Sequence, residues 1–129
     1  MASGILVIDD QKDMLALLKR IIREETEHEV IIEHDPVKAM DHIKKRSFAL
    51  VFTDLKMPRM NGIQVMERIK TLRPDTPVVI MTAFGTIDTA VDAVRRGAFD
   101  YITKPFSRER IMLAIERATT QGADSEAMD

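Results

Sequence analysis

Five short apolar runs, rich in β-branched residues, alternate with longer segments of helical period, and this alternation limits the possible folds most strongly. The runs cover residues 5–8, 29–34, 48–52, 77–81 and 99–103. The helical segments cover residues 13–25, 36–46, 62–72, 86–97 and 107–119. Strands that alternate with helices of this length form βαβ units, in which helices cover both faces of a parallel sheet. The sequence therefore predicts a doubly wound α/β fold.

The apolar content of each run predicts where its strand lies in the sheet. The first, third and fourth runs are continuously apolar, as expected of interior strands. The second run carries Glu33 and His34 and is typical of an edge strand. In the first helical segment the large apolar side chains fall on one face, with polar residues largely opposite: Met14, Leu15, Leu18, Ile21 and Ile22.

Length and composition exclude several classes of protein. With 129 residues the chain has the size of one domain, which we place at residues 1–119. Residues 120–129 are polar and are expected to form a disordered tail or a linker. The net charge of -2 argues against direct nucleic-acid binding, and the lack of cysteine excludes disulfides and thiol chemistry. No apolar run approaches the length of a membrane span, about 18 residues, so we expect a cytoplasmic protein without a membrane partner.

Polar residues mark the carboxyl ends of four of the five predicted strands. They are Asp9 and Asp10, Thr53 and Asp54, Thr82, and Thr103 and Lys104. In an open parallel sheet, ligands bind outside these ends, at the point where the strand order reverses. A strand order of 2-1-3-4-5 would place the first and third strands at that point and bring Asp9, Asp10 and Asp54 together.

This pattern of side chains suits a metal ion and a phosphoryl group. Three neighbouring carboxylates repel each other unless a cation lies between them, and a set of oxygen ligands fits Mg²⁺ best. Lys104 and the Thr82 hydroxyl could then bind a phosphoryl group, which an aspartate can accept covalently. Each residue alone has a simpler explanation: a turn or helix cap for an aspartate, a helix cap or a loop position for Thr82, and a solvated strand end for Lys104. The joint pattern favours the site.

Four motifs resemble those of the receiver domains of two-component response regulators. They are "LVIDD" (6–10), "FTDLKMPRMNG" (52–62), "VVIMTAFG" (78–85) and "DYITKPF" (100–106). The resemblance implies a flavodoxin-like (CheY-like) fold: a five-stranded doubly wound parallel sheet, order 2-1-3-4-5, with five helices. The segment 82–106 is most similar to receivers of the nitrogen-regulation (NtrC) type, which occur in sigma-54-dependent activators.

The resemblance implies a role for each acidic residue of the cluster. Asp54 would be the phosphoacceptor. Asp10, Asp54 and the backbone carbonyl of Lys56 would bind Mg²⁺ directly, and Asp9 would act on the metal through water. Lys56 and Phe84 stand at positions that bear on the lifetime of the phosphoryl group, and we expect bulky Phe84 to hinder attacking water.

The resemblance also implies which residues bind and sense the phosphoryl group. Thr82, Lys104 and the backbone N–H of Ala83 would bind its oxygens. Tyr101 matches the aromatic residue that rotates inward when Thr82 moves. The peptide bond between Lys104 and Pro105 would be cis.

On this resemblance the chain is a phosphorylation-activated switch and not a turnover enzyme, although it would phosphorylate and dephosphorylate itself with Mg²⁺. A sensor histidine kinase or a small phosphodonor would phosphorylate Asp54 and change the surface of the fourth helix, fifth strand and fifth helix. The mixed charge of that surface indicates either a solvated face or the interface of a phosphorylation-dependent homodimer. We expect an excised receiver whose transcriptional output domain is absent from this chain; the alternative is a stand-alone receiver that acts by protein–protein interaction.

Three other functions fit parts of the pattern. A phosphatase with Asp9 as nucleophile would need an acid two residues later, where Gln11 stands. A nucleotide- or flavin-binding domain would need a glycine-rich loop after the first strand, and none follows it. A degenerate receiver acting only as a scaffold would have no need of the complete set of aspartates, threonine and lysine.

Overall fold

The computed structural model describes residues 4–128, and the side chains of residues 4–120. The strands are β1 (Gly4–Ile8), β2 (Glu29–Glu33), β3 (Leu50–Asp54), β4 (Val78–Thr82) and β5 (Asp100–Thr103). The helices are α1 (Lys12–Glu25), α2 (Pro36–Lys45), α3 (Gly62–Leu72), α4 (Ile87–Arg95) and α5 (Arg108–Met128). Strands and helices alternate in the predicted order, so the fold prediction is confirmed.

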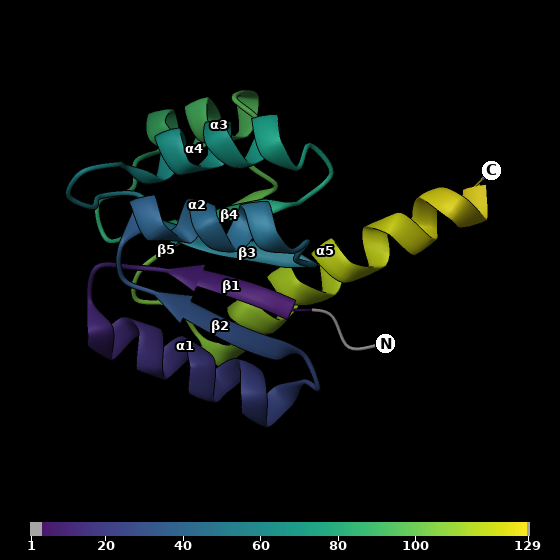
Figure 1. Ribbon diagram of the computed structural model, residues 1–129. Helices are drawn as coiled ribbons and strands as arrows, with labels where there is room; N and C mark the ends of the chain where they lie inside the picture. Colours follow the sequence, from purple (N-terminus) through teal and green to yellow (C-terminus); the bar gives the residue numbers. More distant parts are fainter. Residues whose placement is uncertain (1–3, 129) are drawn as a thin grey trace.

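The five strands form one parallel sheet in the order β2-β1-β3-β4-β5 (Figure 1). β1, β3 and β4 are buried along their whole length, while β2 lies at an edge, as the apolar pattern predicts. Ile8 is in register with Thr53 on the neighbouring strand. The next residues, Asp9 after β1 and Asp54 at the end of β3, therefore lie side by side at the point where the strand order reverses.

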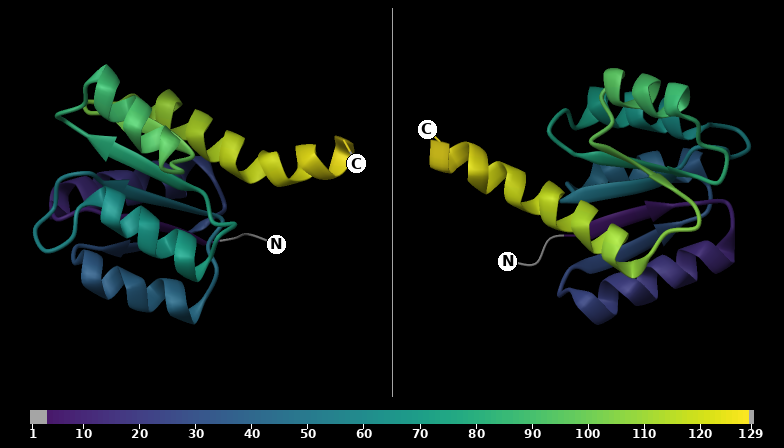
Figure 2. Two further views of the ribbon diagram at one scale, coloured as in Figure 1. Left: turned by 90° about the horizontal axis from the view of Figure 1, so that it is seen from above. Right: turned by 180° about the vertical axis from the view of Figure 1, so that it is seen from behind.

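Helices cover both faces of the sheet, and side chains that alternate along each strand fill two separate cores. In β1, Ile5 and Val7 pack with α1 and α5, whereas Leu6 and Ile8 pack with α2 and α3. Figure 2 shows α5 on the face opposite α2, α3 and α4. The carboxyl ends of all strands remain uncovered by these helices, which leaves that edge to the loops.

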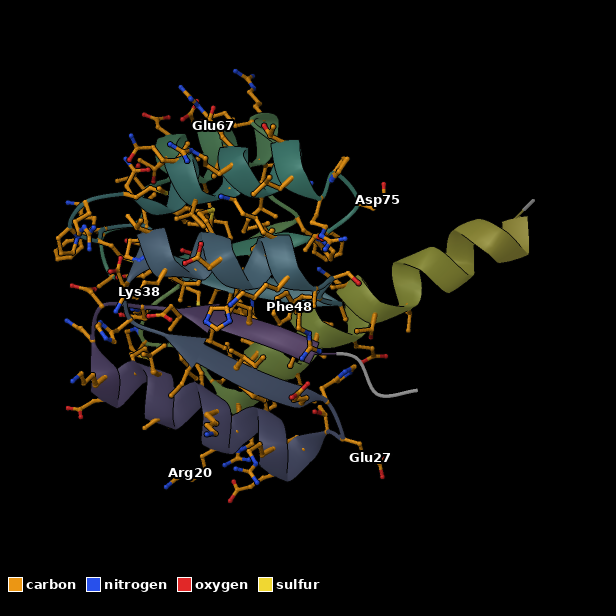
Figure 3. All side chains as sticks on the ribbon, in the orientation of Figure 1. Arg20, Glu27, Lys38, Phe48, Glu67 and Asp75 are labelled. Carbon is orange, nitrogen blue, oxygen red and sulfur yellow. The ribbon has the colours of Figure 1, made fainter. Side chains whose placement is uncertain are left out.

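The helices pack through the faces that the sequence predicts. The buried residues of α1 all come from its predicted apolar face: Leu15, Leu18, Ile21 and Ile22. Arg20 of α1, in contrast, is exposed on the outside of the molecule (Figure 3). Two helices begin at capping boxes next to the carboxyl edge, α3 with Asn61 and Gln64, and α4 with Thr86 and Thr89. These caps satisfy the first backbone N–H groups and fix where each helix leaves its loop.

Helix α5 does not stop at the end of the predicted domain but continues to Met128, beyond the edge of the sheet (Figures 1 and 2). Residues 120–128, predicted as a disordered tail or a linker, are thus helical, because an existing helix lengthens without a new nucleus. Residue 129 of that predicted segment lies outside the described residues. A linker role stays a prediction. Within residues 4–128 no helix is both long and apolar enough to cross a membrane.

Candidate functional site

Three aspartates meet at the carboxyl edge of the sheet, on the left of Figure 1. One carboxylate oxygen from each of Asp9, Asp10 and Asp54 lies within 4.8 Å of the others. Asp9 is fully buried, Asp54 is 8% exposed, and Asp10 faces solvent. The predicted meeting of the three carboxylates is confirmed, and the cluster has a buried floor with one side open to water.

Lys104 reaches this acidic cluster from the loop after β5. Its Nζ atom lies 2.9 Å from Asp9 Oδ2 and 3.2 Å from Asp54 Oδ1. Its side chain is only 11% exposed, so the alternative of a solvated strand end is wrong. The Lys104 N–H donates to the carbonyl oxygen of Thr82 at 2.8 Å, and the bond to Pro105 is cis, as the motif implies. The lysine is therefore fixed through its backbone as well as its ammonium group.

The charges of the cluster act on Asp54. Burial raises the pKa of the Asp54 carboxyl, and the charge of Asp9 raises it further. Lys104 lowers the same pKa through its charge and its hydrogen bond, without cancelling the rise. The surroundings of Asp54 thus disfavour its ionised form, which a nearby cation stabilises.

The alternative roles of the aspartates can be judged from their contacts. Asp9 Oδ1 accepts a hydrogen bond from the N–H of Gln11 at 2.9 Å, so Asp9 does form a turn. The N-cap of α1 is Gln11, without a side-chain cap, so the helix-cap alternative is wrong for both Asp9 and Asp10. One carboxylate oxygen of Asp9 supports the turn and the other bonds Lys104.

The cluster fits a hard divalent cation. Its side-chain ligands are all carboxylate oxygens, which Mg²⁺ prefers, and exposed Asp10 leaves room for the water molecules that Mg²⁺ retains. Three carboxylates face a single ammonium group, so negative charge remains in excess. Lys56, whose carbonyl is a predicted ligand, lies in the loop that directly follows Asp54.

Thr82 ends β4, the strand beside Asp54, and is fully buried. Its hydroxyl oxygen accepts the N–H of Phe84 at 3.0 Å, which leaves the hydroxyl proton able to bond another acceptor. The N-cap of α4 is Thr86, so the helix-cap alternative for Thr82 is wrong, while its place at the start of a loop is correct. Ala83 follows in this loop and is exposed.

Tyr101 contacts the start of α4, which nothing in the sequence pattern indicates. Its hydroxyl oxygen lies 2.9 Å from Thr89 Oγ1, within the capping box that Thr89 forms with Thr86. A Cβ on Gly85 would lie 2.9 Å from the Tyr101 hydroxyl, so glycine leaves room for the ring in this position. The half-buried tyrosine therefore holds the first turn of α4.

Lys56 and Phe84 touch each other between two loops of the site. The Lys56 Nζ lies 4.4 Å from the centre of the Phe84 ring, a cation–π contact between the β3–α3 and β4–α4 loops. Both residues are exposed. The sequence singles out each position, but their contact joins loops that are distant along the chain and has no sequence signal.

The chain matches the family model of the response regulator receiver domain over residues 5–116. The transcriptional regulatory protein ZraR of Klebsiella oxytoca is 34% identical over 123 residues, which cover 95% of this chain and 28% of that protein. The chain spans about a quarter of the length of the curated relatives it matches, such as 28% of ZraR and 26% of NtrX from Azorhizobium caulinodans.

Two solved structures of receiver domains are also similar to this chain. The receiver domain of NtrX from Brucella abortus is 40% identical with a TM-score of 0.83, and the match covers 89% of this chain and 97% of that chain. The beryllofluoride-activated NtrC4 receiver domain dimer is 33% identical with a TM-score of 0.86, covering 92% of this chain and 97% of that one. These matches confirm the resemblance to receivers of the nitrogen-regulation type.

Proposed function

The chain belongs to the response regulator receiver domain family, and from this we propose that it is the switch of a two-component regulator of the nitrogen-regulation type, phosphorylated on Asp54. Receiver domains are signalling switches and not, in general, turnover enzymes. The observation that carries the proposal is the buried contact of Lys104 with two carboxylates of the acidic cluster. We expect the protein to act in the cytoplasm and to receive its phosphoryl group from a sensor histidine kinase.

Asp10, Asp54 and the backbone carbonyl of Lys56 are the proposed Mg²⁺ ligands, with Asp9 acting through water. The convergence of three carboxylate oxygens supports this assignment. A bound Mg²⁺ would stabilise the negative charge of the transferring phosphoryl group. Mg²⁺ would also offset the carboxylate charge that Lys104 alone leaves in excess.

In the proposed reaction a carboxylate oxygen of Asp54 attacks phosphorus. The new oxygen–phosphorus bond forms as the bond to the donor breaks, and the electron pair of that bond stays with the leaving group, a histidine nitrogen or the carboxylate of acetate. Lys104, 3.2 Å from Asp54, favours the ionised nucleophile and stabilises the charge that arrives with the phosphoryl group. Positioning and charge are the main contributions that phosphoryl transfer requires from a protein.

The proposed response begins at the groups that bind the phosphoryl oxygens: Thr82, Lys104 and the N–H of Ala83. As the Thr82 hydroxyl moves toward the phosphoryl group, Tyr101 rotates inward and gives up its hydrogen bond to Thr89. The first turn of α4 then loses a contact, and the surface formed by α4, β5 and α5 changes. A local change of charge thereby shifts the equilibrium between two conformations of this surface.

The proposed output of this change is a homodimer. Helix α4 exposes three apolar side chains on one face, Ile87 (83%), Val91 (43%) and Val94 (53%), which is typical of an interaction surface. The similar NtrC4 receiver is a dimer in its beryllofluoride-activated form. We further propose that residues 120–129 join the receiver to a transcriptional output domain, since the curated relatives are longer.

Incubation with acetyl phosphate and Mg²⁺, followed by intact mass measurement, tests the assignment of Asp54. We expect a gain of about 80 Da for one phosphoryl group, and no gain for Asp54→Ala or after chelation of the metal. If no donor, including a histidine kinase, phosphorylates the wild-type protein, the proposed function is wrong.

Light scattering in beryllofluoride and Mg²⁺ tests the dimer. The wild-type protein is expected to double in mass, and Val91→Glu is expected to stay monomeric because it places a charge on the apolar face of α4. Val37→Glu is the matched control, since Val37 is 40% exposed, close to the 43% of Val91, but lies on α2. Dimerisation of Val91→Glu at the wild-type concentration would exclude this face of α4 as the interface.

A further inference from the structure

Arg59, in the loop between β3 and α3, has a backbone conformation that favours glycine. Its φ is 74°, and the N–H of Met60 donates to the carbonyl oxygen of Pro58 at 2.9 Å across it. A positive φ under such a hydrogen bond is the mark of the rarer, strained form of γ-turn. A residue with a Cβ persists in this conformation only where surrounding contacts offset the strain. The contacts of the Arg59 side chain should therefore show what offsets this strain.

The Arg59 side chain is held by an ion pair with Asp35. Its Nη1 lies 2.7 Å from Asp35 Oδ2, and the Asp35 side chain is only 11% exposed. The other oxygen, Asp35 Oδ1, accepts the N–H of Val37 at 2.9 Å and caps α2. Asp35 is thus fixed by its own helix, and it can anchor the loop that carries Arg59.

Hydrogen bonds also connect Asp35 to Asp9, a member of the acidic cluster. The N–H of Asp35 donates to Glu33 Oε2 at 3.1 Å, and the carbonyl oxygen of Glu33 accepts the N–H of Asp9 at 3.2 Å. A continuous path therefore runs from Asp9 through the β2–α2 loop to Arg59. It links the loop after Asp54 to the strand end that carries the other two carboxylates.

We propose that Arg59 is a positioning residue whose ion pair with Asp35 holds the β3–α3 loop in the conformation that binds Mg²⁺. This inference rests on the proposed function, because it concerns the same metal site. The loop begins directly after Asp54 and contains Lys56, the proposed carbonyl ligand, three residues before Arg59. Without the ion pair the strained turn keeps only its backbone hydrogen bonds and the burial of Met60, and the loop populates other conformations more often. Mg²⁺ must then select the competent fraction, which weakens its apparent affinity.

The size of the effect follows from the exposure of the pair. Arg59 is 61% exposed and Asp35 is half-buried, so the pair resembles a surface ion pair. Loss of such a pair should raise the Mg²⁺ dissociation constant about two- to fivefold. High salt should reduce the difference between wild type and variants, because it screens the exposed guanidinium.

Four variants separate charge from backbone strain. Arg59→Gln removes the charge and keeps a Cβ at positive φ, so the strain stays without the ion pair, whereas Arg59→Gly removes the charge and the strain together. Asp35→Asn removes the charge but keeps a residue that caps helices well. Arg59→Lys retains a cation and should recover part of the affinity, though without the planar geometry of the guanidinium.

The test is a titration of the unphosphorylated 129-residue chain with Mg²⁺ alone, followed by NMR at the backbone amides of Asp10 and Lys56. Arg59→Gln and Asp35→Asn should each weaken binding about two- to fivefold, and the double variant no further, because both remove the same interaction. Arg59→Gly should bind Mg²⁺ more tightly than Arg59→Gln, because it leaves no strain for the ion pair to offset. Urea unfolding without metal is measured in parallel. A purely structural pair would lower the unfolding midpoint and leave the Mg²⁺ dissociation constant unchanged.

Glu29→Gln is the matched control, because it breaks an ion pair of the same length, 2.7 Å between Arg46 and Glu29, at the opposite end of β2. Its Mg²⁺ affinity should equal that of the wild type. If Arg59→Gln and Asp35→Asn bind Mg²⁺ as tightly as the wild type, the positioning role is wrong while the proposed function stands. If the wild type itself binds no Mg²⁺, the metal site of the proposed function is wrong as well.

Discussion

Replacing Lys104 by methionine tests the electrostatics of the site without altering any proposed phosphoacceptor or metal ligand. The substitution keeps an unbranched side chain of similar length and removes the ammonium group. Asp9 and Asp54, which lie 2.9 Å and 3.2 Å from that group, would then share a buried site with no cation. The side chains of Lys104, Asp9 and Asp54 are only 11%, 0% and 11% exposed, so solvent screens this loss weakly.

The expected loss of stability is large. Removing one partner of a buried ion pair costs about 3–5 kcal/mol, and we expect the lower end, about 3 kcal/mol, because the cluster is open to water at Asp10. The direction in which this loss of stability changes with pH follows from Asp54, whose pKa is already raised by burial and by Asp9. Without Lys104 this pKa rises further. The folded state is then penalised increasingly as the pH rises from the ordinary value of 3.8 through the raised pKa, so the loss should be greater at pH 7 than at pH 4.

Urea unfolding of wild type and Lys104→Met, with and without Mg²⁺, measures these effects. Mg²⁺ should stabilise the variant more than the wild type, because it replaces the missing positive charge. Lys44→Met is the control: Lys44 is exposed on α2, and its replacement should change stability by less than about 0.5 kcal/mol. A metal-free Lys104→Met protein as stable as this control would refute the reasoning that Lys104 holds the buried carboxylates together.

Three further predictions follow from contacts around the site. Asp54→Asn should stabilise the metal-free protein at pH 7, because the ionised carboxylate is disfavoured there, and urea unfolding should show no gain below pH 3.8. Phe84→Ala should speed loss of the phosphoryl group several-fold by intact mass, whereas Leu72→Ala, an exposed apolar residue on α3, should not; equal rates would contradict the shielding role. Tyr101→Phe removes the hydrogen bond to Thr89, which is worth about 1 kcal/mol. Hydrogen exchange at the Thr89 amide should therefore become up to about fivefold faster. Unchanged exchange would mean that this hydrogen bond does not hold α4.

The features that can be predicted from sequence are those with a repeating physical cause. Burial on both faces makes residues 5–8 of β1 and 50–52 of β3 continuously apolar, and the charged residue Glu33 is tolerated in β2 because that strand lies at the edge. Parallel strands end at one edge of the sheet, so polar residues at strand ends must gather there. The pattern of strands and helices thus predicts the edge, and the strand order 2-1-3-4-5 then places Asp9 beside Asp54.

The contacts that cannot be predicted in this way join loops through single side chains. The pairs Lys56 with Phe84 and Arg59 with Asp35 bring together segments without periodicity, and their geometry depends on turns such as the one at Arg59. Local composition also does not indicate the helical conformation of residues 120–128, where the polar segment favours a disordered tail or a linker. There the helix continues because residues 108–119 have already formed its nucleus.

The sharing of Lys104 between two carboxylates explains how one phosphoryl group could change a whole surface. In the unphosphorylated protein the ammonium group divides its contacts between Asp9 and Asp54, and neither carboxylate is fully compensated. A phosphoryl group on Asp54 would bring a charge of about -1.5 to -2, which competes for Lys104 and draws in the Thr82 hydroxyl. Because the backbone N–H of Lys104 is bonded to the carbonyl of Thr82, the lysine and the threonine lie on one connected unit. Redistribution of a single cation would therefore act on the end of β4 directly, and through Thr82 on the position of Tyr101 against α4.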